Sequence, residues 1–197
     1  MSTPWLAAAE QLADDIREPG FAAAALVAST WRARCLPEAT RSLARAAGAL
    51  TGGGAMERVW DRVPPCPSAE ALLRGAEELE GEAAAMRARA QVMAETCEEA
   101  RDKAIREYEI ARKQARQRWL GGPIAQERMA EMRLVIGDCD AALELLGQVI
   151  KRLDYAVHCF RRAPDDFAEA YDIPLEFIRA GGTLPLSGDF LTGVPTR

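Results

Sequence analysis

The sequence predicts an all-α protein built on a long antiparallel coiled-coil hairpin that packs with shorter N-terminal helices as a helical bundle. Three observations support this fold class. Alanine dominates the apolar residues, and no run of alternating Val, Ile or Thr favours a strand. Apolar residues recur with a four–three spacing over two long stretches. A pair of glycines at 121–122 separates these stretches, so the chain can fold back there.

The N-terminal region is expected to form several short helices. Pro4 follows a threonine that can cap a helix, and Gly20 is expected to end that helix. A second apolar stripe at helical spacing covers residues 21–35. A third helix is expected to end at the glycine triplet 52–54, and a further short helix surrounds Trp60.

Two heptad stretches form the hairpin. The first covers residues 68–118 and starts at Ser68, a good helix N-cap that follows a stiff proline-rich linker. The second covers residues 123–162. Small core residues of the first stretch face large ones of the second, which allows the helices to approach closely. Beyond the second stretch, Pro164 and a capping aspartate at 165 or 166 are expected to begin a short separate helix.

The register follows from folding the chain at the glycine pair. Residues whose numbers add to 243 then share a core layer, which places Cys97 beside Leu146 and Ala104 beside Cys139. The flanking e positions pair opposite charges, and one tyrosine faces an arginine in a cation–π contact. The four edge pairs are Glu80 with Arg161, Arg87 with Asp154, Arg101 with Asp140, and Tyr108 with Arg133.

These features divide the chain into four parts. They are short helices at 1–63, a proline-rich linker at 64–67, the hairpin at 68–162 with its turn at 121–122, and a short kinked helix with an irregular tail at 163–197. The hairpin is expected to organise the rest, because its heptads are the longest regular pattern in the chain.

One edge of the second heptad helix is apolar. Its g positions are Val135, Ala142, Val149 and Ala156. We expect this edge to be buried, since burial of apolar surface contributes about 25 cal/mol per Å². The sequence favours cover by the N-terminal helices, whose own apolar stripes need a partner. The alternative is a homo-oligomer in which a second copy covers the same edge.

Composition argues against several functional classes. The net charge of −5 disfavours attraction of the whole surface to nucleic acid or an anionic membrane. The first residues carry acids where a signal peptide needs cations, and the apolar run 21–28 is shorter than the roughly 20 residues of a membrane span. Five cysteines without a CxxC pair indicate buried free thiols in a reducing compartment. We therefore expect a cytoplasmic protein, and the Ala and Arg usage suggests a GC-rich bacterium or its phage.

Residues suited to catalysis are sparse. The one histidine, His158, falls on a solvent-facing heptad position, and Cys159 projects about 100° away from it, so the two make a poor nucleophile–base pair. A di-iron bundle needs two Glu-x-x-His motifs, and the cysteine spacing does not fit zinc. No phosphate-binding glycine motif occurs. The sequence predicts no enzyme, no cofactor and no metal site.

Two segments are candidate partner-binding sites. The first is the basic and aromatic tip of the hairpin, and its residues are Arg112, Lys113, Arg116, Arg118, Trp119, Leu120 and Arg128. The second is the apolar tail, with Leu184, Leu186, Phe190 and Leu191. Structural roles remain open for both, because cations suit a helix C-terminus and the tail can pack on its own chain.

The expected function is that of a non-catalytic interaction or structural protein: an adaptor, a scaffold or a component of a larger assembly. Long heptads, a surplus apolar edge and the lack of a catalytic constellation support this hypothesis. Its partner is expected to be another protein or a second copy of this chain, and no membrane is involved. The alternative hypothesis is a nucleic-acid-associated regulator that uses the basic tip.

Overall fold

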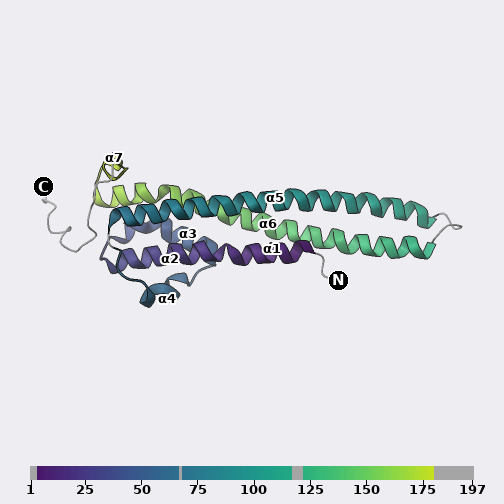
Figure 1. Ribbon diagram of the computed structural model, residues 1–197, viewed down its shortest axis with the longest axis horizontal. Coiled ribbons are helices and arrows are strands. Elements are labelled where there is room, and N and C mark those ends of the chain that lie inside the picture. The colour runs from purple at the N-terminus through teal and green to yellow at the C-terminus, as the bar shows by residue number, and fades with distance from the viewer. Residues whose placement is uncertain (1–3, 67, 117–121, 180–197) are drawn as a thin grey trace. The chain divides into compact units, whose positions relative to one another are not determined.

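The computed structural model describes residues 4–66, 68–116 and 122–179 (Figure 1). The described regular elements are all helical, which confirms the predicted class. In chain order they are α1 (Pro4–Asp15), α2 (Arg17–Arg32), the 3-10 turn η1 (Pro37–Thr40), α3 (Arg41–Thr51), α4 (Ala55–Val59), the 3-10 turn η2 (Trp60–Arg62), α5 (Ala69–Arg116), α6 (Gly122–Tyr171) and α7 (Leu175–Arg179).

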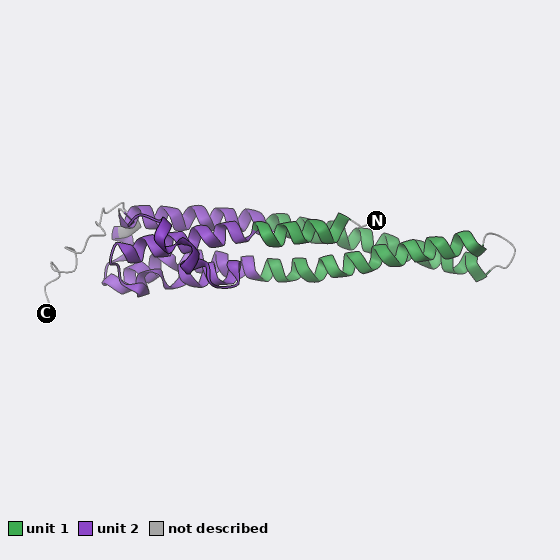
Figure 2. Cartoon of the chain, turned by 90° about the horizontal axis from the view of Figure 1, so that it is seen from below, with its two compact units in different colours: residues 1–15, 88–151 green, residues 16–87, 152–197 purple. Residues whose placement is uncertain are grey.

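The chain divides into two compact units, which Figure 2 shows in different colours. Unit 1 contains residues 1–15 and 88–151, and unit 2 contains residues 16–87 and 152–197. Each unit includes a segment of α5 paired with a segment of α6, so the predicted hairpin is present in both. The shorter N-terminal helices join these segments, α1 in unit 1 and α2 to α4 in unit 2.

In unit 1, α1 packs on the α5–α6 pair. The backbone N–H of Leu6 donates to Asp138 Oδ2 at 3.3 Å, and Asp15 lies 3.9 Å from Arg89. Ala9 and Leu12 are buried on the inner face of α1. Among the described residues, α5 and α6 continue toward their connection beyond the start of α1 (Figure 2). Unit 1 therefore has a three-helix portion followed by a two-helix portion.

The edge pairs of the hairpin agree with the predicted register in both units. In unit 1, Arg101 forms an ion pair with Asp140, and Arg133 lies 5.3 Å from the ring centroid of Tyr108 and donates to its hydroxyl at 2.9 Å. In unit 2, the remaining two edge pairs are Arg87 with Asp154 and Arg161 with Glu80. All four predicted edge pairs are confirmed.

The Cys97 thiol has a contact that the predicted core layers do not include. The Cys97 thiol donates to the backbone carbonyl of Cys139 at 3.6 Å, whereas the sequence placed Cys97 beside Leu146. Helical side chains project toward the N-terminus of their own helix. Two long antiparallel side chains therefore reach each other from backbone positions that are several residues apart along the axis. The numbers of each of the four edge pairs add to 241, and these pairs keep the predicted alignment of the two helices.

In unit 2, α6 holds both ends of α3. Near the start of α3, the backbone N–H of Ser42 donates to Asp166 Oδ2 at 2.6 Å, and both residues are buried. At its end, Arg152 donates to the carbonyls of Ala49 and Leu50 at 2.7 and 3.3 Å. Helix termini leave such groups without intrahelical partners, and the macrodipole favours an anion at the start and a cation at the end. The charges on α6 match both ends of α3.

Gly20 does not end a helix, contrary to the expectation. The break occurs at Ile16, between α1 and α2, and Gly20 lies inside α2. A Cβ at this position would lie 2.7 Å from Thr51 Cγ2 and 2.8 Å from Leu50 Cβ, so only glycine allows α2 to approach α3 this closely. Packing space, rather than helix breaking, explains this glycine.

Pro164 does not begin a separate helix either. Helix α6 continues through Pro164 to Tyr171, so the predicted boundary at residue 162 is wrong. The proline removes one hydrogen-bond donor from the helix. Ala163 and Phe167 are almost fully buried on either side, so apolar packing holds this turn in place. The expected capping aspartate, Asp166, instead caps α3.

Three other predicted boundaries agree with the structure. Helix α1 begins at Pro4, and the Ser68 hydroxyl accepts a hydrogen bond from the N–H of Ala71 at 3.2 Å, as an N-cap does. Helix α3 ends at Gly52, which has a left-handed φ of 78°. The short helix near Trp60 is present as α4 and η2.

The apolar edge of α6 is covered within the chain. Ala142, Val149 and Ala156 are buried, and Val135 is half-buried. The preferred alternative, cover by the N-terminal helices, fits the contacts of α1 in unit 1 and of α3 in unit 2. A homo-oligomer through this edge is not needed to bury these three residues.

Candidate interaction surfaces

The basic tip is only partly free for a partner. Arg112 lies 3.3 Å from Glu109, and Arg128 lies 3.0 Å from Glu107. Lys113 and Arg116 are exposed, and no ion pair is recorded for either within the described ranges. The remaining predicted tip residues, Arg118, Trp119 and Leu120, lie outside the described residues. Intrahelical and interhelical carboxylates therefore neutralise two of the predicted cations.

The sequence around the tip has the opposite charge to the rest of the chain. Residues 103–135 contain eight Lys or Arg and four Asp or Glu, a net charge of +4. The other residues contain 17 Lys or Arg and 26 Asp or Glu, a net charge of −9. This separation of charge favours an acidic partner for the tip.

Exposed aliphatic side chains accompany these cations. Ile110, Ile124 and Leu134 are 56%, 73% and 71% exposed, all on the two-helix portion of unit 1. Val92 is also exposed among the described residues of this unit, but it lies outside that portion. We call the described residues 103–116 and 122–135 the tip portion. Exposed aliphatic residues beside cations are typical of protein-binding surfaces.

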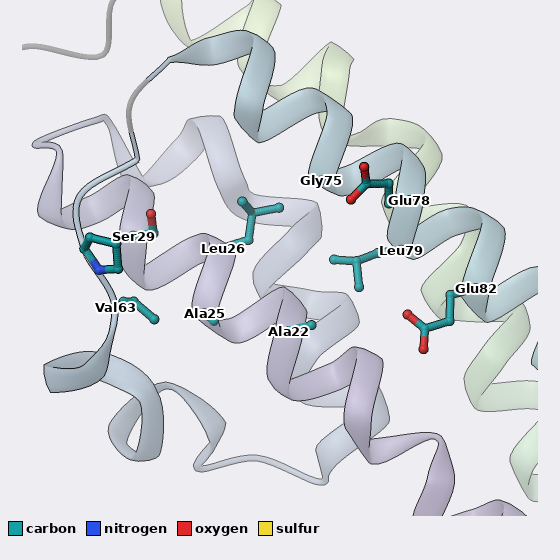
Figure 3. A pocket seen from close by; sticks show the side chains of 10 residues that line it. Ala22, Ala25, Leu26, Ser29, Val63, Gly75, Glu78, Leu79 and Glu82 are labelled. Carbon is teal, nitrogen blue, oxygen red and sulfur yellow. The ribbon is translucent and has the colours of Figure 1, made fainter.

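An open groove of about 440 Å³ lies between α2, the segment after η2, and α5, all in unit 2. Leu26 of α2 and Leu79 of α5 lie between the two helices (Figure 3). Gly75 lets the Leu26 side chain pack closely against α5, because a Cβ there would lie 3.1 Å from Leu26 Cδ2. The full lining is Ala22, Ala25, Leu26, Ser29, Val63, Pro64, Gly75, Glu78, Leu79 and Glu82. We call this cavity the α2–α5 groove.

Two carboxylates come from the α5 side of this groove. Glu78 and Glu82 are exposed and lie one helical turn apart (Figure 3). No ion pair is recorded for either among the residues that the structure describes. The groove thus combines an apolar floor with two acids that no recorded cation neutralises.

Sequence reasoning missed the α2–α5 groove. In the sequence, Glu78 and Glu82 resemble ordinary solvated acids of a surface helix, and no pattern indicates that α2 pairs with α5. The signal that could have revealed it is Gly75, a residue of poor helix propensity inside a long, regular helix.

A second cavity, of about 470 Å³, surrounds Asp166 in unit 2. Its charged lining residues are Glu38, Arg41, Asp166 and Glu169. Asp166 already accepts the N–H of Ser42, and Arg162 lies 3.7 Å away. The carboxylate therefore has a structural partner, and this cavity is less suited to bind a ligand through it.

The thiols and the histidine form no reactive pair. His158 is exposed, whereas Cys159 is buried, and burial raises the pKa of the Cys159 thiol. Burial also raises the pKa of Cys97, to about 12. All five cysteines are free and buried, as the sequence predicted. Within the described ranges, no cluster of three His, Cys, Asp or Glu is suited to hold a metal ion.

The tail residues Leu184, Leu186, Phe190 and Leu191 lie outside the described residues. Among the described helices, none has both the length and the apolar character to span a membrane. Comparison with known proteins finds no matching family model, no matching curated protein and no matching solved structure.

Proposed function

We propose that this chain is a non-catalytic interaction protein that presents the tip portion to an acidic protein partner. The observation that carries the proposal is the uncovered two-helix portion of unit 1. There, Ile110, Ile124 and Leu134 are largely exposed in a segment of positive net charge. Among the described residues, helix α1 covers α6 as far as the contact between Leu6 and Asp138 and not beyond it.

The chemistry of this surface fits a protein partner. Binding interfaces are driven by a small number of well-buried apolar or aromatic side chains, and surrounding charges select the partner and its orientation. Isolated aliphatic side chains on a solvent-exposed helix contribute nothing to the fold. Their burial in a complex would contribute about 25 cal/mol per Å².

The nucleic-acid alternative has less support. Phosphate binding draws its affinity from unpaired cations that release counterions. In the tip portion, Arg112 and Arg128 already contact carboxylates, and Arg133 contacts Tyr108. Lys103, Arg106, Lys113 and Arg116 are the described cations of the tip portion that make no such contact, so three of its seven described cations are already engaged.

Affinity capture from the native host tests the proposal. The bait is the full chain, compared with a tip variant that combines Lys113→Glu, Arg116→Glu and Ile124→Ser. The matched control is Arg62→Glu with Lys151→Glu, which alters the net charge by the same amount at exposed sites outside the tip portion. We expect specific proteins that the control retains and the tip variant loses. Capture of the same set by all three baits would contradict the proposal.

A salt titration distinguishes the proposed function from the nucleic-acid alternative. Fluorescence anisotropy with a labelled duplex and a labelled single strand should show no specific binding at about 50 mM salt. Binding that weakens steeply with salt, and that is lost with Lys113→Glu and Arg116→Glu, would favour the nucleic-acid function instead.

A further inference from the structure

We infer that the α2–α5 groove receives the tip portion of a second copy of this chain. This inference rests on the proposed function and names its partner. The two surfaces belong to different units, so one chain offers both halves of the interface, and a second chain can supply the complement.

The groove has the chemistry to bind an apolar and cationic segment. Leu26 and Leu79 provide apolar contact surface, and Glu78 and Glu82 stand beside it without a recorded counterion. A volume of about 440 Å³ lies within the range of roughly 300–1,000 Å³ that ligand pockets usually have. An occupant with aliphatic side chains and nearby cations would fill the floor and neutralise both acids.

The tip portion has this composition. Ile110 precedes Lys113 and Arg116 on α5 at intervals of three residues, so the three share one side of the helix. Ile124, at the start of α6, adds a second exposed aliphatic side chain. The two acids of the groove, about one turn apart, match two cations that are also about one turn apart. Opposite net charges of the two regions would favour their encounter.

The C-terminal tail is a less suitable occupant. Residues 180–197 contain four large apolar residues, but their only charged residues are Asp189 and Arg197. Such a segment could fill the apolar floor, but it offers no excess of cations to neutralise Glu78 and Glu82. Charge complementarity therefore selects the tip portion.

The geometry of this contact predicts the kind of assembly. The two halves of the interface are different surfaces of one chain. Two copies can therefore dock reciprocally as a twofold dimer, with each tip in the groove of the other, or can repeat a single contact into open chains or closed rings. Association is therefore expected to grow with protein concentration and to weaken with salt.

Sedimentation velocity of the full chain, from about 1 to 200 µM, tests the inference. At about 50 mM salt we expect concentration-dependent association, which about 500 mM salt weakens. A groove variant, Glu78→Lys with Glu82→Lys, and a tip variant, Lys113→Glu with Arg116→Glu, are each expected to weaken association at least tenfold. The matched control, Arg62→Glu with Lys151→Glu, should associate like the wild type.

Mixing the two variants gives the decisive result. The reversed groove should bind the reversed tip, so the mixture should associate more tightly than either variant does alone. Gly75→Leu provides a second test without any change of charge, because its side chain would occupy the groove beside Leu26. It should weaken association while circular dichroism shows an unchanged helix content.

Two results would overturn the inference. The first is a wild-type chain that stays monomeric up to about 200 µM at low salt. The second is an association that the groove variant and Gly75→Leu both leave unchanged. If the wild type is monomeric but the tip variant still loses proteins captured from the host, this inference fails and the proposed function stands. If the tip variant captures the same host proteins as the wild type, the proposed function itself fails.

Discussion

Asp166→Ala should destabilise unit 2 more than an ordinary surface substitution. The carboxylate is almost fully buried and accepts the N–H of Ser42 at 2.6 Å. Hydrogen bonds to a charged group contribute about 1.5–3 kcal/mol, and the favourable position at a helix N-terminus adds about 0.3–1 kcal/mol. The alanine also leaves the buried Ser42 N–H without its partner. We expect a loss of about 2–4 kcal/mol in the free energy of unfolding.

Three further variants make the prediction specific. Asp166→Asn keeps an acceptor but removes the charge, so it should lower the free energy of unfolding by about half as much as Asp166→Ala. Arg152→Met keeps the apolar stem but removes the donors to Ala49 and Leu50, and should cost about 1–2 kcal/mol. Asp165→Ala is the matched control, because no hydrogen bond or ion pair is recorded for this neighbour, and it should stay within about 0.5 kcal/mol of the wild type.

Urea unfolding of the full chain, followed by circular dichroism, measures these differences. For a chain of this size, 1 kcal/mol corresponds to a shift of about 2–4 °C in the melting temperature, so Asp166→Ala should lower it by roughly 4–16 °C. An Asp166→Ala variant as stable as Asp165→Ala would refute the assignment of Asp166 as the cap of α3.

The remaining predictions concern close packing and alkaline pH. Gly20→Ala should be about 1–3 kcal/mol less stable than Gly48→Ala in urea unfolding, because a Cβ at Gly20 would lie 2.8 Å from a neighbouring Cβ while one at Gly48 meets nothing within 4 Å. Equal stability of the two variants would contradict the close approach of α2 and α3. Burial raises the pKa of Cys97 from 9.0 to about 12, so folding favours the protonated thiol; its contribution is complete below pH 9 and is lost as the pH rises toward 12. The free energy of unfolding in urea, measured from pH 8 to 11, should therefore fall more steeply for the wild type than for Cys97→Ala, by about 3 kcal/mol at pH 11, and parallel curves would show that this thiol is not buried.

Much of the hairpin could be predicted because its signals are local and repetitive. The heptads determine which face of each helix is apolar, and pairs such as Arg101 with Asp140 select the antiparallel alignment. The contact of the Cys97 thiol with the carbonyl of Cys139 was not predicted, because heptad positions indicate which side chains face each other and not which backbone group a thiol reaches.

The tertiary features of unit 2 had no comparable sequence signal. Gly20 resembles a helix breaker, and its role becomes clear only when Leu50 and Thr51 approach it from α3. Asp166 resembles an N-cap of its own helix, but it caps a helix 124 residues earlier in the chain. The α2–α5 groove likewise depends on which helices become neighbours, which the heptads of α5 and α6 do not determine. Local patterns specified the elements, whereas long-range packing created the candidate site.

The distance between residues 101 and 140 tests the central claim, the antiparallel hairpin, most directly. Spin labels at Arg101→Cys and Asp140→Cys, in a variant whose five native cysteines are replaced, can be measured by pulsed electron resonance after dilution with unlabelled protein. Because the two side chains form an ion pair across the hairpin, we expect one distribution of distances below about 20 Å. The same 39 residues in a single continuous helix would span about 58 Å, and a distribution near that distance would contradict the account.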